Sequence, residues 1–180
     1  MNRMKWLLTM TLTAGWMIST LQAQHFHWGP EIQAYPTGLI PGIAFEKSGD
    51  RGAWNVRLGY NLVNHRDLGI QDDERGGGFG GSLGYQYFLK KYGSKWFMGA
   101  RTDLWRNRID WKNQPGTPQE VQGTSKIVVL QPTAIAGYAW SIGSFQLRPT
   151  IAFGAEINVK TVGKEVGHGA ILLAGIQLVW

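Results

Sequence analysis

The sequence predicts an all-β protein, an eight-stranded antiparallel up-and-down β-barrel that crosses a membrane. Three observations support this fold class. Apolar and polar residues alternate with a period of two over long stretches, as in strands with one buried face. Beyond residue 23 there is no run of 18 consecutive apolar residues, so helical spans are excluded. The last twelve residues place apolar side chains at every second position and end in the aromatic Trp180.

The first 23 residues read as a secretory signal peptide. Arg3 and Lys5 give a positive start, the stretch from Trp6 to Leu21 has no charge, and Ala23 supplies a small residue for cleavage. An N-terminal membrane anchor is the alternative, but the apolar stretch is short for a span of about 20 residues. We therefore expect a signal peptide at 1–23 and one barrel domain at 24–180.

Composition narrows the functional classes. Cleavage after Ala23 leaves sixteen Lys and Arg against twelve Asp and Glu, a net charge near +4. These basic residues are scattered, and export also argues against nucleic acid as a partner. The chain has no cysteine, so neither disulfides nor thiolate metal sites can stabilise it.

Eight segments are predicted to be strands. In chain order they are 25–36, 39–47, 52–64, 77–90, 95–110, 125–139, 144–159 and 168–180. The clearest runs from Phe145 to Lys160, where the odd positions are apolar and the even positions, Lys160 included, are polar or small. Residues 96–106 fit less cleanly, because Arg101 and Asp103 share a face with Trp105.

The connections alternate in length. Residues 48–51, 91–94 and 141–143 are tight, glycine-containing turns, whereas 65–76 and 111–124 are long and polar. Segment 161–167 is intermediate, and 36–38 is short. In outer-membrane barrels the short turns face the periplasm, so both termini are expected to be periplasmic.

Aromatic residues gather near the predicted strand ends. They are Trp28, Tyr35, Trp54, Tyr87, Tyr92, Trp96, Trp111, Trp140 and Trp180. Amphipathic rings favour membrane–water interfaces, so we expect them to form girdles at both interfaces. The alternative, a soluble lipocalin-like barrel, would instead place Arg57, Arg148 and Glu156 on the outside.

With eight strands and an apolar C-terminus, the chain resembles small outer-membrane β-barrel proteins of the OmpA, OmpX and OmpW type, without matching one family. Gly175, Leu178 and Trp180 resemble the C-terminal signal that the barrel-assembly machinery reads in that class. The resemblance implies a location in the outer membrane of a Gram-negative bacterium. It also implies outer-membrane lipid and the assembly machinery as partners.

If the apolar faces point to lipid, seven charged residues point into the lumen. They are Glu31, Glu46, Arg57, Arg101, Asp103, Arg148 and Glu156. The lumen of an eight-stranded barrel is just wide enough for side chains to fill it, and buried charges must be paired. An Arg–carboxylate network that plugs the lumen is the simplest interpretation. A narrow solute path, or a polar pocket, is the alternative. Inward apolar residues such as Val129, Ile135 and Leu173 are consistent with simple packing or with a cavity for a hydrophobic ligand.

Sequence motifs give little support for catalysis, a cofactor or a metal. The glycine run 76–81 precedes a strand rather than the helix that a dinucleotide-binding fingerprint requires. His25 and His27 share a strand face and could bind a metal with Glu31, but are more simply exposed side chains. Lipid A deacylases of the PagL type use a His and a Ser two residues apart, and here His168 is followed by Ala170. A PagP-like pairing of His65 with Ser125 has no support beyond their predicted nearness to the outer rim.

We therefore predict a non-catalytic outer-membrane barrel with a plugged lumen that serves envelope integrity or surface interaction. Loops 65–76 and 111–124 are the candidates for contact with an extracellular ligand. The second hypothesis is a narrow channel or transporter for a small polar or hydrophobic solute. The third is a lipid-modifying enzyme.

Overall fold

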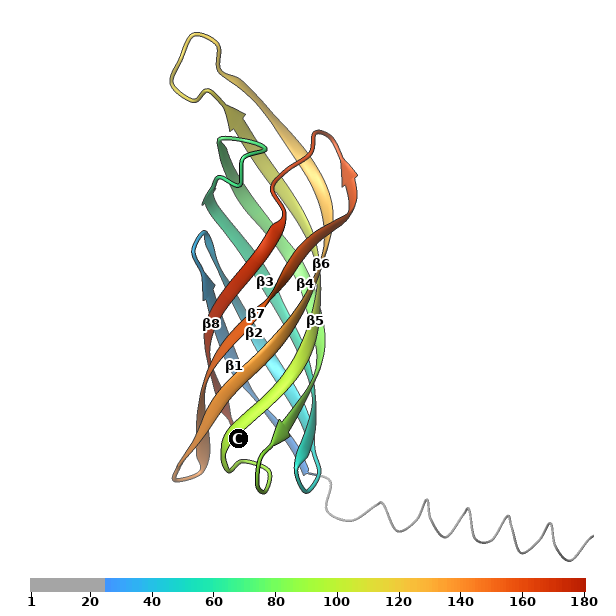
Figure 1. The fold of residues 1–180 in the computed structure, drawn as a ribbon, viewed down its shortest axis with the longest axis vertical. Coiled ribbons are helices and arrows are strands. Elements are labelled where there is room, and N and C mark those ends of the chain that lie inside the picture. The colour runs from blue at the N-terminus through green and yellow to red at the C-terminus, as the bar shows by residue number, and fades with distance from the viewer. Residues whose placement is uncertain (1–24) are drawn as a thin grey trace, which may run out of the picture.

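The computed structural model describes residues 25–180, and the predicted signal peptide lies outside them. Eight antiparallel strands form a closed barrel in which each strand pairs with its sequence neighbours and β1 pairs with β8 (Figure 1). This confirms the predicted all-β, eight-stranded, antiparallel up-and-down barrel. The strands are β1 (His25–Tyr35), β2 (Gly38–Ser48), β3 (Gly52–Arg66), β4 (Asp73–Phe88), β5 (Lys95–Asn113), β6 (Val121–Ile142), β7 (Phe145–Val162) and β8 (Gly169–Val179). Among residues 25–180 there is no helix with the length and hydropathy to cross a membrane.

The two ends of the barrel differ. The end that carries His25 and Trp180, here the terminal end, has the three short turns 49–51, 89–94 and 143–144. The opposite end, here the loop end, has connections 36–37, 67–72, 114–120 and 163–168. In Figure 1 the hairpin of β5 and β6, coloured yellow at its tip, projects farthest at the loop end.

The predicted boundaries of the two long loops were wrong. β4 already begins at Asp73, which pairs with Lys112, and Asn113 pairs with Val121. The irregular segments are therefore only 67–72 and 114–120, not 65–76 and 111–124. The polar composition of these segments suggested loops, but their backbone groups pair across the hairpins and extend the sheet.

The glycine run in β4 allows this extension. Gly76 and Gly77 have φ angles of 146° and 153°, which disfavour any residue with a side chain. A Cβ atom on Gly76 or Gly78 would collide with the backbone oxygen of Arg108 or Arg106. β4 therefore passes close to β5 through this run rather than beginning after it.

Two irregularities change which face a residue occupies. The β3–β4 register shifts between Val63 and Arg66, and His65 lies there with a φ of 50°. The β6–β7 register shifts where Val128 pairs with Lys160 and Val129 pairs with Asn158, so Val159 is the extra residue. A bulge of this kind reverses the inward and outward alternation. The prediction that Lys160 lies on the polar inward face was wrong, because Lys160 is exposed.

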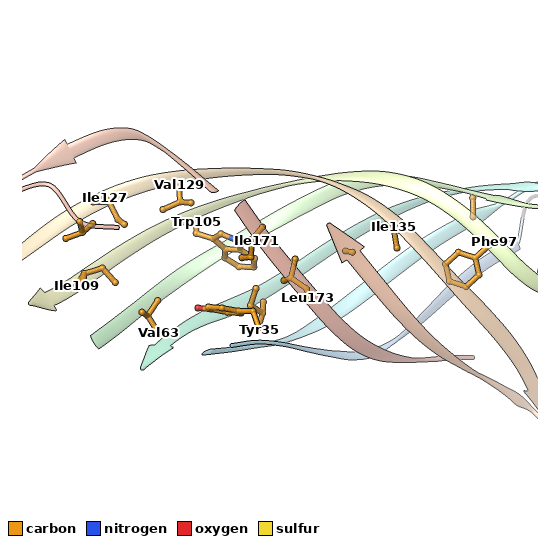
Figure 2. Close-up of a cluster of buried hydrophobic side chains, with 14 of the residues drawn as sticks. Tyr35, Val63, Phe97, Trp105, Ile109, Ile127, Val129, Ile135, Ile171 and Leu173 are labelled. Atoms are coloured by element: carbon orange, nitrogen blue, oxygen red, sulfur yellow. The ribbon is translucent and has the colours of Figure 1, made fainter. Parts of the chain in front are cut away.

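The barrel is apolar outside and mostly polar inside. Leu58, Ile151 and Phe153 are each more than 60% exposed, whereas Arg57 and Arg148 are fully buried in the lumen. Apolar side chains fill the remaining interior, and Figure 2 shows Trp105 among Val129, Ile171 and Leu173. The interior thus contains both buried polar side chains and a cluster of buried apolar ones.

The nine aromatic residues that were predicted to lie at the membrane interfaces divide into two groups, six exposed and three that contact the lumen. Six exposed rings lie at the terminal end, namely Trp28, Trp54, Tyr87, Trp96, Trp140 and Trp180. The prediction that Tyr35, Tyr92 and Trp111 belong to such girdles was wrong. Tyr35 donates a hydrogen bond to Asn61 in the lumen, Trp111 donates one to Ser125, and Tyr92 contacts Arg148. The polar atom of each of these three side chains thus has its hydrogen-bond partner inside the barrel instead of at the membrane surface.

Candidate functional site in the barrel lumen

Buried arginines and carboxylates occupy the lumen at three levels. We call these the terminal layer (Glu46 and Arg148), the middle layer (Glu31, Arg57, Arg101 and Asp103) and the loop-end layer (Arg66, Glu74 and Glu156). All seven charged residues that the sequence placed inward are buried here, and each lies in an ion pair. Arg66 and Glu74 are additional members that the sequence did not indicate.

The terminal layer joins β7 to β2 across the lumen. Nη1 of Arg148 lies 2.9 Å from each carboxylate oxygen of Glu46. Its Nη2 donates to the hydroxyl of Tyr92 at 2.9 Å and to Oε1 of Gln146 at 2.7 Å. Tyr92 in turn donates to Glu46. Burial raises the pKa of Tyr92, so its hydroxyl remains protonated and able to donate.

Aromatic rings surround the same guanidinium group. The carbon Cζ of Arg148 lies 5.2 Å from the ring centroids of both Phe88 and Tyr92, within the range of cation–π attraction. Phe88 packs on Phe97 with ring centroids 5.1 Å apart. The terminal layer is thus a buried charged pair with aromatic rings packed against its guanidinium group.

The middle layer balances two cations against two anions. Arg57 donates to Glu31 at 3.0 Å and to Asp103 at 3.0 Å. Arg101 donates to the same Glu31 oxygen at 2.8 Å, and its Nε lies 3.1 Å from Asp103. Both arginines also donate to the side-chain oxygen of Gln33. Each carboxylate therefore contacts both guanidinium groups, as a closed ring of four charges.

The loop-end layer has one cation between two carboxylates. Nε of Arg66 lies 2.7 Å from Glu74 and Nη1 lies 2.5 Å from Glu156. Gln131 donates to the second Glu156 oxygen at 2.8 Å and accepts from the indole of Trp105 at 2.8 Å. The second Glu74 oxygen accepts from the backbone N–H of Gly167 at 2.6 Å. Neutral donors thus hold the carboxylate oxygens that the arginine does not reach.

Arg66 and Glu74 escaped the sequence analysis for a structural reason. Counting in steps of two from Asn61 gives Val63 and then His65, so strict alternation assigns position 65 rather than 66 to the lumen. The irregularity between Val63 and Arg66 changes that parity. The sequence offered one signal: Arg66 and Glu74 carry opposite charges within a segment that was read as a loop. Opposite charges alone do not say whether either side chain points into the lumen.

The candidate catalytic and metal-binding groups do not converge. Ser125 is buried and donates to the backbone oxygen of Lys164, whereas His65 is exposed with Nδ1 3.2 Å from Asp73. His27 contacts Ser48 and the backbone oxygen of Trp180, and Glu31 lies in the middle layer. Over residues 25–180, no group of three His, Cys, Asp or Glu side chains is arranged to hold a metal ion.

The C-terminal residues form the seam with β1. Trp180 exchanges backbone hydrogen bonds with Trp28 at 3.0 and 3.4 Å, and their rings stack with centroids 5.8 Å apart. Leu178 pairs with Leu147 on β7. A Cβ atom on Gly175 would lie 2.8 Å from the side chain of Gln33, so this position allows β8 to approach β1 closely. The role of Gly175, Leu178 and Trp180 as an assembly signal stays a prediction.

Known structures include barrels of similar shape. The N-terminal β-barrel domain of Pseudomonas aeruginosa OprF aligns with a TM-score of 0.46 and 10% identity, over 86% of this chain and 96% of that one. Neisserial surface protein A (NspA) aligns with a TM-score of 0.42 and 13% identity, over 86% of this chain and 91% of that one. No protein-family profile matches the sequence, and neither does any curated protein.

Proposed function

We propose that this chain is a non-catalytic outer-membrane barrel whose lumen is closed by three charged layers. It would serve envelope integrity, or surface interaction through its loop end. The observation that carries the proposal is the reversed polarity of the barrel: charged side chains are inside and large apolar side chains are outside. A protein in water would arrange them the other way, because exposed apolar area is unfavourable there.

The height of the exterior apolar belt supports a membrane location. On β5 the outward residues from Trp96 to Leu104 carry no charge, and Arg106 begins the polar region. Eight residue steps at roughly 3.4 Å, in a strand tilted by roughly 40°, span about 20 Å of membrane normal. That height approaches the ~25 Å apolar band of outer-membrane barrels.

The closure of the barrel supports the same location. Backbone hydrogen bonds connect all eight strands around the ring, so no sheet edge is exposed to lipid. The girdle of Trp and Tyr at the terminal end would lie at one membrane interface. By the usual asymmetry of these barrels, the short turns and both termini would face the periplasm.

The lumen is expected to be closed because a solute would meet the three charged layers one after another. A solute would have to displace each layer in turn, and every displacement would leave buried charges without their partners. The expected residual conductance is therefore low even when one layer is opened. A channel, by contrast, would depend strongly on the charge at its narrowest point.

Planar-bilayer recording of the refolded protein without residues 1–23 tests this proposal. Insertion is first shown by heat-modifiable mobility on gels and by protection of the strands from protease. We expect inserted wild-type protein and the Arg148→Ala variant both to lack stable conductance steps, because two layers remain in the variant.

Arg51→Ala provides the matched control, since it removes an arginine from the exposed turn 49–51 at the same end of the barrel. Stable ion-selective steps in the wild type that change with Arg148 but not with Arg51 would refute the plug and establish a solute path. A protein that folds but does not enter bilayers would refute the membrane location itself.

A further inference from the structure

Four basic side chains gather on the outside of β5, β6 and β7, just beyond the apolar belt toward the loop end. They are Arg106, Arg108, Lys126 and Lys160, and all are exposed. Arg108 pairs directly with Lys126 across the strands. Arg106 pairs with Val128, which pairs on its other side with Lys160. The four residues, here the basic cluster, are therefore neighbours on one surface rather than scattered charges.

The bulge at Val159 completes the basic cluster. Without this extra residue, Lys160 would keep the inward parity of Glu156 and Asn158. With the extra residue, Lys160 points outward beside Val128, on the same outer surface as the basic side chains of β5 and β6. Bulges commonly redirect a side chain at a functional rim, and here the result is a fourth cation at a shared surface.

The basic cluster has almost no neutralising partner. The nearest ion pair joins Arg108 to Asp110 at 4.0 Å, and both side chains are exposed. Within residues 25–180, Arg106, Lys126 and Lys160 form no ion pair. Like charges directly opposite each other destabilise a sheet, so placing Arg108 against Lys126 favours a bound anion. The cluster lines a hollow of about 620 Å³ together with Val128 and Val162.

An apolar groove on β3, β4 and β5 lies beside this hollow and meets it at Arg106. In the next row toward the terminal end, Leu58 pairs with Gly81 and Gly81 pairs with Leu104. Gly81 has no side chain to fill the space between the two leucines, and a groove of about 580 Å³ runs there past Phe79 and Leu83. Arg106 lines both the groove and the hollow. The combined surface is cationic at one end and apolar at the other.

We infer that this surface binds a phosphorylated, acylated lipid of the outer leaflet, with phosphate in the basic cluster and an acyl chain along the Gly81 groove. The inference rests on the proposed membrane location, which puts the basic cluster at headgroup level. An ion such as free phosphate would use the cations but not the apolar groove. A neutral lipid would use the groove but leave the paired cations without a counter-charge.

Native mass spectrometry of the refolded, signal-free protein in detergent tests the inference. The probe is lipid A with both phosphates, compared with the same acylated disaccharide without them. We expect Arg108→Gln/Lys126→Gln to weaken binding of the phosphorylated lipid by about 30-fold, because each cation near an anionic surface raises affinity by about fivefold. Removal of the phosphates from the probe should weaken wild-type binding to a similar extent.

Lys90→Gln/Lys91→Gln is the matched control, because it removes two exposed cations from the turn 89–94 at the terminal end. It should bind the phosphorylated lipid like the wild type. Equal losses in both double variants would overturn the inference, since net charge alone would then explain binding. Release of the lipid by millimolar inorganic phosphate would also overturn it and indicate a phosphate site.

Bilayer insertion and lipid binding together separate the lipid site from the membrane location. All variants change exposed residues, and heat-modifiable mobility shows whether each has folded. If the wild type inserts into bilayers but the Arg108 and Lys126 variant binds lipid A normally, the lipid site is refuted and the membrane location stands. If the wild type does not insert, both are refuted.

Discussion

Nη1 of Arg148 contacts both carboxylate oxygens of Glu46, although 102 residues separate the two in the chain. The pair connects β7 with β2, strands that are not neighbours in the sheet. It therefore crosses the lumen instead of reinforcing a strand pairing. Such cross-lumen pairs connect strands that the hydrogen bonds of the sheet do not connect.

Arg148→Leu should lower the free energy of unfolding by about 3–5 kcal/mol, because Glu46 would remain buried without its cation. Urea unfolding of the barrel in lipid vesicles, followed by tryptophan fluorescence, measures the change. Arg51→Ala should unfold at the same urea concentration as the wild type, as expected for an exposed turn residue.

The double variant Glu46→Leu/Arg148→Leu separates charge pairing from packing. Removing both partners leaves no uncompensated charge, so much of the lost stability should return. If the double variant is as unstable as the sum of the two single variants, the two residues are not energetically coupled and the terminal layer is not a unit.

Gly76→Ala should destabilise the barrel by about 1–3 kcal/mol, because alanine at this φ of 146° is strained and its Cβ would meet the Arg108 oxygen. Gly49→Ala is the comparison, since a Cβ there would approach only the Gly52 oxygen, at an ordinary 3.8 Å. Thermal unfolding of both variants measures the difference. Equal melting temperatures would contradict the close approach of β4 to β5.

The direction of Lys160 can be tested with single cysteines, since the chain contains none of its own. Lys160→Cys should react readily with a charged maleimide in the folded protein. Asn158→Cys should react much more slowly, because Asn158 is half-buried and its amide donates to the Val166 oxygen. Similar rates at the two positions, which strict alternation would place on one face, would argue against the bulge.

The folded conformation of loop 114–120 should become less stable in acid. The Gly116 N–H, 2.8 Å from Glu120, and then Lys112, 3.2 Å away, hold the pKa of the Glu120 carboxyl below its usual value. The stabilisation is therefore complete above the unfolded pKa of about 4.3 and is lost as pH falls through the lowered folded value.

The Gly116 amide resonance in an NMR titration reports this change. Its chemical shift should titrate with a midpoint below about 4.3, the ordinary glutamate value. Glu120→Gln should abolish the titration. A midpoint at or above the ordinary value would show that the loop hydrogen bond does not favour the charged carboxylate.

The sequence was sufficient for the fold because period-two alternation reports burial directly. Seven inward charges were assigned correctly to one face, since each lies in a regular part of its strand. Arg66 and Lys160 were not, because each follows an irregularity that changes parity, and Glu74 was missed because its segment was read as a loop. Register shifts depend on contacts between strands, and alternation within one strand does not record them.

The aromatic residues illustrate a second limit. Position near a strand end predicted that Tyr35 and Trp111 lie at an interface, but both have inward parity and find polar partners in the lumen. Alternation within β1 and β5 already gives both residues the inward parity of Glu31 and Asp103, so nearness to a strand end was the wrong criterion. The grouping of Arg106, Arg108, Lys126 and Lys160 into one basic cluster was visible only in the three-dimensional arrangement.

The seam between β1 and β8 determines how this barrel must form. Trp28 and Trp180 meet there although they lie at opposite ends of the described chain. Closing a loop of that length is entropically costly, so the seam is expected to form late. Until then the nascent sheet exposes two unpaired edges, each a template for aggregation. A cell that makes this protein therefore needs to shield β1 and β8 for the whole interval before they meet.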